Sequence, residues 1–137
     1  MKKTTRRYKA IKLRKKLRGE TANLNRQYIT TFKEIKKYFN LFNRAVFDDN
    51  LDAFNDIKIV NLRQCRGEVV CYEWERKGTR VYHLNMLPKY RNKKEFLDTL
   101  CHEMIHLYQM NNKGDTGNHN ELFYSFRPRL NYIGLDI

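Results

Sequence analysis

Apolar positions between residues 92 and 110 recur with the period of an α-helix. Asn92, with Glu95 three positions later, predicts an N-cap and a capping box, and neither Gly nor Pro interrupts the pattern before about Met110. At about 100° per residue, the apolar side chains share one arc of roughly 180°. Its members are Phe96, Leu97, Leu100, Cys101, Met104, Ile105, Leu107 and Tyr108. This arc predicts the core-facing side of the helix. The opposite half is polar and carries Asp98, Thr99, His102, Glu103, His106 and Gln109.

The segment TTFKEIKKYFNLFNRAVF has the same helical period. Thr31 and Glu34 predict a capping box at its start. The apolar residues that follow are spaced by three or four positions: Phe32, Ile35, Phe39, Phe42 and Val46. We interpret these aromatic residues as core rather than as a surface on which bases stack.

Three later segments alternate in the manner of β-strands: DIKIVNL, GEVVCYEWE and TRVYHLNML. RKG is predicted to join the last two in a hairpin, and His83 is interpreted as a strand residue without a metal role. Together the elements predict an α+β fold, with an N-terminal helix, a small three-stranded antiparallel sheet and a second helix. Residues 20–137 form one domain in this prediction, and residues 1–19 precede it as a basic arm.

The net charge of +13 is concentrated at the N-terminus. The first 18 residues contain no acidic residue but ten basic ones: Lys2, Lys3, Arg6, Arg7, Lys9, Lys12, Arg14, Lys15, Lys16 and Arg18. Such segments commonly bind nucleic acid through its phosphates, so DNA is the expected partner. A disordered solubilising tail is the alternative, and large apolar anchors for a membrane surface are missing. We expect that the arm can be removed without loss of the fold.

Cysteine usage and hydropathy narrow the class of protein. Cys65, Cys71 and Cys101 form no C-x-x-C pair, so neither a zinc ribbon nor a disulfide framework is predicted. No apolar run has the length of a membrane span, and the N-terminus is too charged for a signal peptide. We therefore expect a soluble protein of the cytoplasm, with its oligomeric state left open.

The polar half of the later helix contains the candidate chemistry. In LCHEMIHLYQ, His102 and His106 lie four residues apart and Glu103 directly follows the first. The two imidazoles are about 40° apart and one turn displaced, so both can reach one ion. An H-E-x-x-H pair of this kind binds zinc, with the glutamate as general base. A solvated polar face is the alternative.

An open zinc site takes three protein ligands and a water molecule, so a third ligand must come from elsewhere. His119 is the favoured residue, because the loop NNKGDTGN contains turn residues that let the chain double back. Glu121 and Asp115 are weaker candidates. The extended motif H-E-x-x-H-x-x-G-x-x-H is excluded, since Gln109 and Asn112 stand at its Gly and His positions.

From about residue 38 to 126 the chain resembles the SprT-like metalloprotease family, which includes the Spartan proteases. The similar segments are FNRAVFDDNL, NLRQCRGEV, VYHLNMLPKY, LDTLCHEMIHLYQ and HNELF. In the last of these, His119 and Phe123 match a His-Gly-x-x-Phe element, and Asn120 stands at the usual glycine. The resemblance implies a zincin-like domain with a metal helix and a His-bearing loop, one Zn²⁺ per chain, and proteolysis. In the best-known members it also implies repair of DNA–protein crosslinks. The short length suggests a version from a phage or another mobile element, whose site of action would be the host cytoplasm.

Many family members append a cysteine-rich zinc ribbon, which this sequence does not show. The basic arm is then the available DNA contact, a step that is our inference and not the family's pattern.

Two hypotheses for the function of the site differ in the role of the zinc ion. In the first, Glu103 is the general base of a zinc endopeptidase, and Tyr108, Tyr124 and Arg127 are open candidates for stabilising the oxyanion. In the second, three histidines hold a structural zinc in a nucleic-acid-binding module without peptidase activity. A metal-free interaction protein is a third, less specific possibility.

Overall fold

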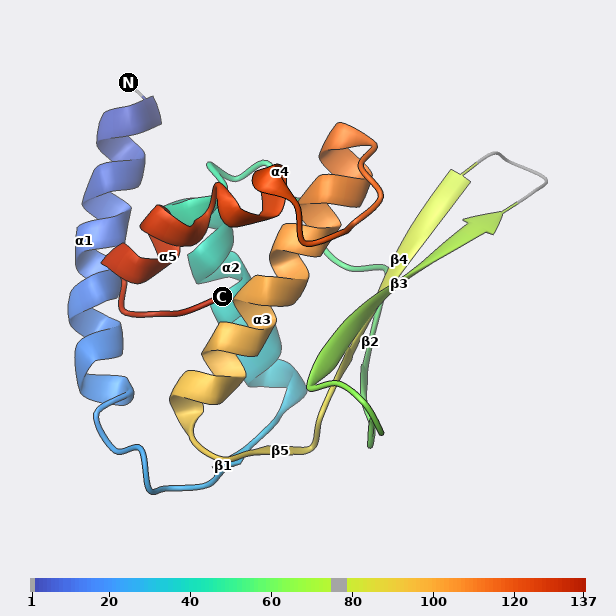
Figure 1. Ribbon diagram of the computed structural model, residues 1–137. Helices are drawn as coiled ribbons and strands as arrows, with labels where there is room; N and C mark the ends of the chain where they lie inside the picture. The colour runs from blue at the N-terminus through green and yellow to red at the C-terminus, as the bar shows by residue number, and fades with distance from the viewer. Residues whose placement is uncertain (1, 75–78) are drawn as a thin grey trace.

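The computed structural model describes residues 2–74 and 79–137 and shows a small α+β domain with two small sheets (Figure 1). Its elements follow in the order α1 (Lys2–Glu20), β1 (Tyr28–Ile29), α2 (Phe32–Val46), β2 (Asp56–Ile59), β3 (Gly67–Trp74), β4 (Thr79–Met86), β5 (Lys89–Tyr90), α3 (Lys93–Leu107), the π-helical turn η1 (Tyr108–Asn112), α4 (Glu121–Tyr124) and α5 (Arg127–Tyr132). The predicted hairpin turn RKG lies outside the described residues. None of the helices in the described ranges is long and apolar enough to cross a membrane.

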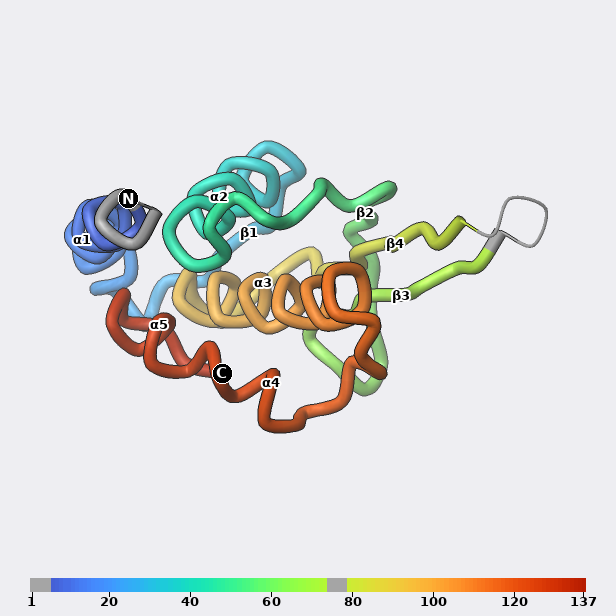
Figure 2. The backbone as a smooth tube through the Cα atoms, turned by 90° about the horizontal axis from the view of Figure 1, so that it is seen from above, coloured from blue at the N-terminus to red at the C-terminus, as the bar shows by residue number. Residues whose placement is uncertain are grey.

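Helix α3 runs through the centre of the molecule (Figure 2). The side chain of Asn92 caps it by accepting a hydrogen bond from the Glu95 backbone N–H at 2.8 Å, which confirms the predicted N-cap. The carboxylate of Glu95 does not complete the capping box, because it accepts instead from the backbone N–H of Arg91 at 3.2 Å. Every apolar residue of the predicted arc as far as Leu107 is buried, against α2 on one side and the C-terminal segments on the other. Thr31 caps α2 by accepting a hydrogen bond from the Glu34 backbone N–H at 3.2 Å, which confirms the predicted N-cap. The reciprocal half of the capping box is not seen among the described residues, where Oε2 of Glu34 has no hydrogen-bond partner.

The larger sheet has the strand order β2-β4-β3. Strands β3 and β4 are antiparallel, but β2 pairs with β4 in parallel, from Asp56 opposite His83 to Ile59 opposite Met86. The prediction of an antiparallel sheet is therefore wrong for one of its two pairings. The chain leaves β2, crosses the end of β4 and forms β3 on the far edge. Alternation in sequence identifies strand residues, but it does not say on which edge each strand pairs.

The predicted basic arm is the long helix α1, which packs beside α2 (Figures 1 and 2). Leu13 and Leu17 are 4% and 1% exposed and belong to the hydrophobic core. The side chain of Arg6 reaches Asp48, which follows α2, at 3.1 Å. The segment that we expected to be removable thus contributes two buried leucines to the core.

Three of the six residues on the polar half of the predicted helix are buried, two on α3 and one on η1, and the other three are partly exposed. Thr99, Glu103 and Gln109 are 8%, 5% and 0% exposed. Strand β3 begins at Gly67, where an added Cβ would lie 2.9 Å from Thr99 Cγ2 and 3.3 Å from Glu103 Cγ. Glycine is therefore what allows the strand to approach the helix this closely.

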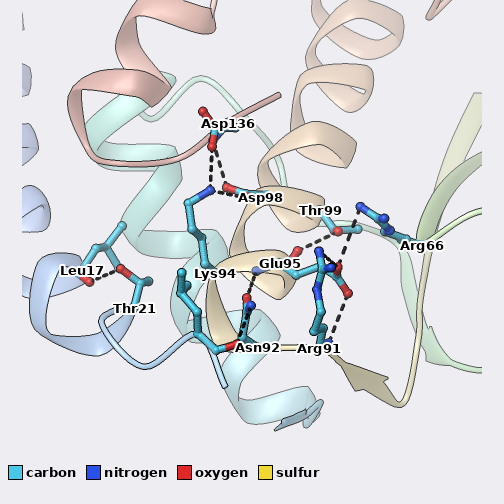
Figure 3. A network of polar contacts seen from close by, with 11 residues as sticks. Leu17, Thr21, Arg66, Arg91, Asn92, Lys94, Glu95, Asp98, Thr99 and Asp136 are labelled. Carbon is cyan, nitrogen blue, oxygen red and sulfur yellow. Dashed lines mark hydrogen bonds and ion pairs between the residues drawn. The ribbon is translucent and has the colours of Figure 1, made fainter. Parts of the chain in front are cut away.

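The C-terminal residues close over the same side of α3 (Figure 3). The ammonium of Lys94 bridges Asp98 at 2.9 Å and Asp136 at 2.6 Å. The Asp136 backbone N–H also donates to Asp98 at 2.9 Å. These contacts place the last residues at one wall of the cleft described below.

Candidate metal centre

Three histidine side chains converge at the C-terminal half of α3. The Nε2 atom of His102 lies 3.2 Å from that of His106, and the Nε2 atom of His119 lies 3.1 Å and 3.2 Å from these two. Tetrahedral nitrogen ligands about 2.0–2.1 Å from a zinc ion are themselves about 3.3–3.4 Å apart. The three nitrogens therefore nearly match one face of such a tetrahedron, and the cluster could hold a metal ion.

Hydrogen bonding alone cannot satisfy this triangle of nitrogens. In a neutral imidazole each Nε2 is either a donor or an acceptor. The three nitrogens form three pairwise contacts, and each nitrogen is either a donor or an acceptor. At least two of the three must be of the same kind, so at least one contact joins two donors or two acceptors. A cation resolves the conflict, because it takes a lone pair from all three nitrogens.

Two of the rings are held in the neutral form that a metal requires. Burial, and to a smaller extent the neighbouring imidazoles, lowers the pKa of His102 to about 4. Burial also lowers the pKa of His106, against the opposing effect of its hydrogen bond to Gln109. At neutral pH both rings can present a lone pair to a cation.

Gln109 orients one of these rings. Its Oε1 lies 2.9 Å from Nδ1 of His106, and its Nε2 donates to the Asn118 carbonyl at 2.8 Å and to Asn120 Oδ1 at 3.0 Å. With its amide N–H groups committed to the loop, Gln109 can only accept from His106, so the His106 proton lies on Nδ1 and the Nε2 lone pair faces the cluster. Sequence reasoning missed this role, although the position three residues after His106 on the same helix face could have indicated it.

The loop that carries His119 is fixed by its own hydrogen bonds. Asn120 caps α4 by accepting from the Phe123 N–H at 3.1 Å, and its amide donates to both oxygens of Asp115 at 3.1 Å. At φ −106° its backbone is extended, so no glycine is needed where the family usually has one. Gly114 and Gly117, predicted as turn residues, do adopt positive φ angles of 62° and 80°.

Of the three candidates for a third ligand, the structure brings only His119 to the helix pair. The Asp115 carboxylate is engaged by Asn120, and this hydrogen bond lowers its pKa. Glu121 is exposed at the start of α4 and lies outside the cluster, within the part of the chain that is described. Phe123 lies beneath all three histidine rings, with centroid distances of 4.7–5.0 Å.

Glu103 lies on α3 and lines a cleft next to the histidine cluster. The pKa of Glu103 is raised to about 8, mainly by burial and to a smaller extent by the nearby Glu68, while a hydrogen bond with the Val69 backbone lowers it. The cleft has a volume of about 400 Å³ and is lined by Cys65, Arg66, Gly67, Asp98, Thr99, His102, Glu103, Asp136 and Ile137. The carboxylate of Glu103 and the ring of His102, one of the three clustered histidines, therefore line the same open cavity.

The basic residues predicted to bind nucleic acid lie on α1, which the structure does not bring to the histidine cluster (Figure 1). Three of them form ion pairs with Asp48, Asp49 and Glu20. The side chains of Lys2 and Lys3 lie outside the described part. The ring of His83 packs at a tilt of 58° against that of Tyr72 in the sheet, with centroids 4.7 Å apart, and lies outside the histidine cluster.

A model of the SprT-like family matches residues 35–134 of the chain. The match spans α2 to α5 and includes the three histidines and Glu103, while α1 lies before it. Comparison with curated proteins gives no match.

Proposed function

The chain belongs to the SprT-like family, and on this premise we propose that it is a zinc-dependent endopeptidase that cleaves proteins, in particular proteins bound or crosslinked to DNA. The observation that carries the proposal is the triangle of Nε2 atoms 3.1–3.2 Å apart, next to a buried glutamate that faces the same cleft.

The ligand set favours a catalytic over a structural metal. Structural zinc sites close with four protein ligands, often cysteines, whereas catalytic sites have three and keep one position open. Among the described residues, the cluster comprises His102, His106 and His119 and no further His, Cys, Asp or Glu. Zinc bound there would polarise the scissile carbonyl and lower the pKa of water.

Glu103 is the proposed general base. It takes a proton from the attacking water and delivers it to the nitrogen of the leaving amine. A raised pKa suits this exchange, because a carboxylate that titrates near neutral pH can both accept and return a proton. The carboxylate form of Glu103 would be favoured by the positive charge of a zinc ion held by the three histidines.

The candidates for stabilising the oxyanion are no longer equivalent. Tyr108 packs against Phe47 and Phe126 at centroid distances of 6.1 Å and 5.2 Å, so its ring belongs to an aromatic cluster. Tyr124 is 40% exposed and packs at 5.1 Å on Phe123, which underlies the histidines. Tyr124 is therefore the preferred donor in this proposal.

The positive charge of the chain supports the proposal that its protein substrates are bound to DNA. The net charge is +13, and ten of the basic residues occur in the first 18 positions, most of them on exposed positions of α1. Binding through phosphates would raise the local concentration of protein substrates on DNA.

Metal analysis combined with a proteolysis assay tests the proposal. Purified protein should contain one zinc ion per chain and cleave an unstructured polypeptide. Cleavage should be faster when the protein and its substrate are bound to the same DNA molecule. Glu103→Gln should keep the zinc and lose nearly all hydrolysis, and Glu121→Gln serves as the control because Glu121 is exposed outside the cluster. Full zinc occupancy without cleavage of any polypeptide would favour the structural-zinc module instead.

A further inference from the structure

Two groups of basic side chains on α1 differ in whether acidic residues pair with them. On one flank, Arg6 pairs with Asp48 at 3.1 Å, Lys9 with Asp49 at 3.7 Å and Lys16 with Glu20 at 3.4 Å. These charges are balanced within the protein.

The other flank faces α5 and lacks such balance. Arg14 and Arg18 are exposed and lie one helical turn apart, and neither forms an ion pair with a described residue. The guanidinium of Arg14 lies 4.9 Å from the ring centre of Tyr132. Both arginines line a cavity of about 300 Å³ together with Thr21, Asn131, Tyr132, Ile133 and Gly134. The cavity thus offers positive charge, an amide and an aromatic ring, and no carboxylate.

A second pair of the same kind lies closer to the histidines. The guanidinium of Arg127 lies 4.5 Å from the ring centre of Tyr124. Tyr124 and Tyr132 are 40% and 42% exposed, so both rings are accessible to a ligand. Helices α1, α5 and α4 follow one another along one side of the molecule, and α4 lies nearest the histidine-bearing end of α3 (Figure 2). Exposed arginines and tyrosines therefore alternate between α1 and the candidate metal centre.

We propose that this surface, called the α1/α5 face and formed by Arg14, Arg18, Arg127, Asn131 and Tyr132, binds single-stranded nucleic acid. The arginines contact phosphates, and the ring of Tyr132 stacks on a base. Tyr124, the preferred oxyanion donor, borders the face where it meets the candidate metal centre. Surfaces that combine positive charge with aromatic rings are typical of proteins that bind single strands, because unpaired bases expose their faces. In a duplex those faces are stacked, and the ring of Tyr132 would contribute little.

Binding of a single strand by the α1/α5 face adds detail to the DNA part of the proposed function and rests on that part. It does not depend on peptide hydrolysis. A strand on this face would run toward α4, so a protein attached to that strand would be brought to the cleft. Net charge alone predicts neither which flank of α1 binds the strand nor which form of nucleic acid is preferred.

The test is fluorescence anisotropy with a labelled single-stranded oligonucleotide of mixed sequence, titrated with zinc-loaded Glu103→Gln full-length protein. Arg14→Gln combined with Arg18→Gln removes two charges from the α1/α5 face. Lys9→Gln combined with Lys16→Gln removes two charges from the balanced flank of the same helix. Losing two phosphate contacts should lower the slope of log affinity against log salt by about 1.4. The control pair should leave that slope nearly unchanged, and circular dichroism should show the same helix content in all variants.

Tyr132 distinguishes single strands from duplexes. Tyr132→Leu should weaken single-strand binding at least about fivefold and leave binding of a duplex of equal length unchanged, while Tyr132→Phe should bind both as the parent does. Equal losses in the two charge-removing pairs would overturn the α1/α5 face. Parent binding of the duplex as tight as that of the single strand, with no effect of Tyr132→Leu, would overturn the preference for single strands.

The outcomes also separate this inference from the proposed function. If the parent binds DNA and the Arg14→Gln, Arg18→Gln variant binds equally well, only the α1/α5 face is rejected. If the parent does not bind nucleic acid at all, the face and the DNA part of the proposed function fail together, and cleavage of a free polypeptide by the wild type still decides the peptidase.

Discussion

Gln109→Met removes the side chain that orients His106 without leaving a large cavity, because the two residues are similar in length and volume. Three hydrogen bonds are lost, to His106 at 2.9 Å, to Asn118 at 2.8 Å and to Asn120 at 3.0 Å. Asn120 Oδ1 retains the Phe123 N–H, and the Asn118 carbonyl lies in an exposed loop where water can reach it. The principal penalty is the unpaired Nδ1–H of His106, so we expect a loss of about 1–3 kcal/mol in the free energy of unfolding.

The metal affinity should fall as well, by about 10- to 100-fold, which is the usual effect of removing a hydrogen-bond partner from a ligating histidine. Without Gln109 the His106 ring can carry its proton on either nitrogen, so part of the population presents an N–H to the ion. Competition with a chromogenic chelator measures the zinc affinity, and urea unfolding in the presence of a chelator measures stability separately. Gln27→Met, at an exposed position outside the cluster, is the matched control. Unchanged zinc affinity together with reduced stability would refute the orienting role and leave Gln109 as a packing residue.

Three further predictions address neighbouring features of the site. Since burial raises the pKa of Glu103 from 4.5 to about 8, the folded metal-free protein keeps a proton that the unfolded chain releases. Its stability should therefore fall as the pH rises, and Glu103 accounts for a loss of about 1.6 kcal/mol between pH 6.5 and 8. Histidines are half protonated near pH 6.5, but they affect the wild type and Glu103→Gln alike, so the difference between the two proteins isolates Glu103. Urea unfolding at several pH values should show this fall in the wild type and not in Glu103→Gln. His119→Ala should lower zinc occupancy strongly in metal analysis, whereas Glu121→Ala should leave it unchanged, and the reverse result would reassign the ligand. Gly67→Ala should reduce hydrolysis and stability, because its Cβ would lie 2.9 Å from Thr99 Cγ2 and push β3 away from α3; wild-type turnover in this variant would show that the strand can shift freely.

Local signals in the sequence predicted the helices that contain most of the core and the histidine pair of the candidate metal centre. The caps at Asn92 and Thr31 are short-range interactions, and the apolar arc of α3 needs only the helical period. His119 could be proposed because turn residues precede it. These features are encoded within a few residues of one another, which is why they can be read without a structure.

Features that depend on distant segments could not be predicted in this way. The parallel pairing of β2 with β4 requires a choice of sheet edge, for which the sequence contains no local rule. Helix α1 contributes Leu13 and Leu17 among many charges, so its weak apolar pattern looked like a solvated arm. Gln109 was placed correctly on the polar half of the predicted helix, but in the structure it lies in η1, and its burial results from the returning loop at Asn118 and Asn120.

The hydrogen bonds that join Gln109, Asn120 and Asp115 have a consequence for the thermodynamics of metal loading. They order the loop up to His119 using groups of the protein alone, so the conformational entropy of that loop is lost when the chain folds and not when an ion arrives. Small zinc domains behave differently, because their ligands come together only with the metal and chelators unfold them. Here a chelator should leave the backbone in place, and calorimetry should register zinc binding as a local event with a small change in heat capacity.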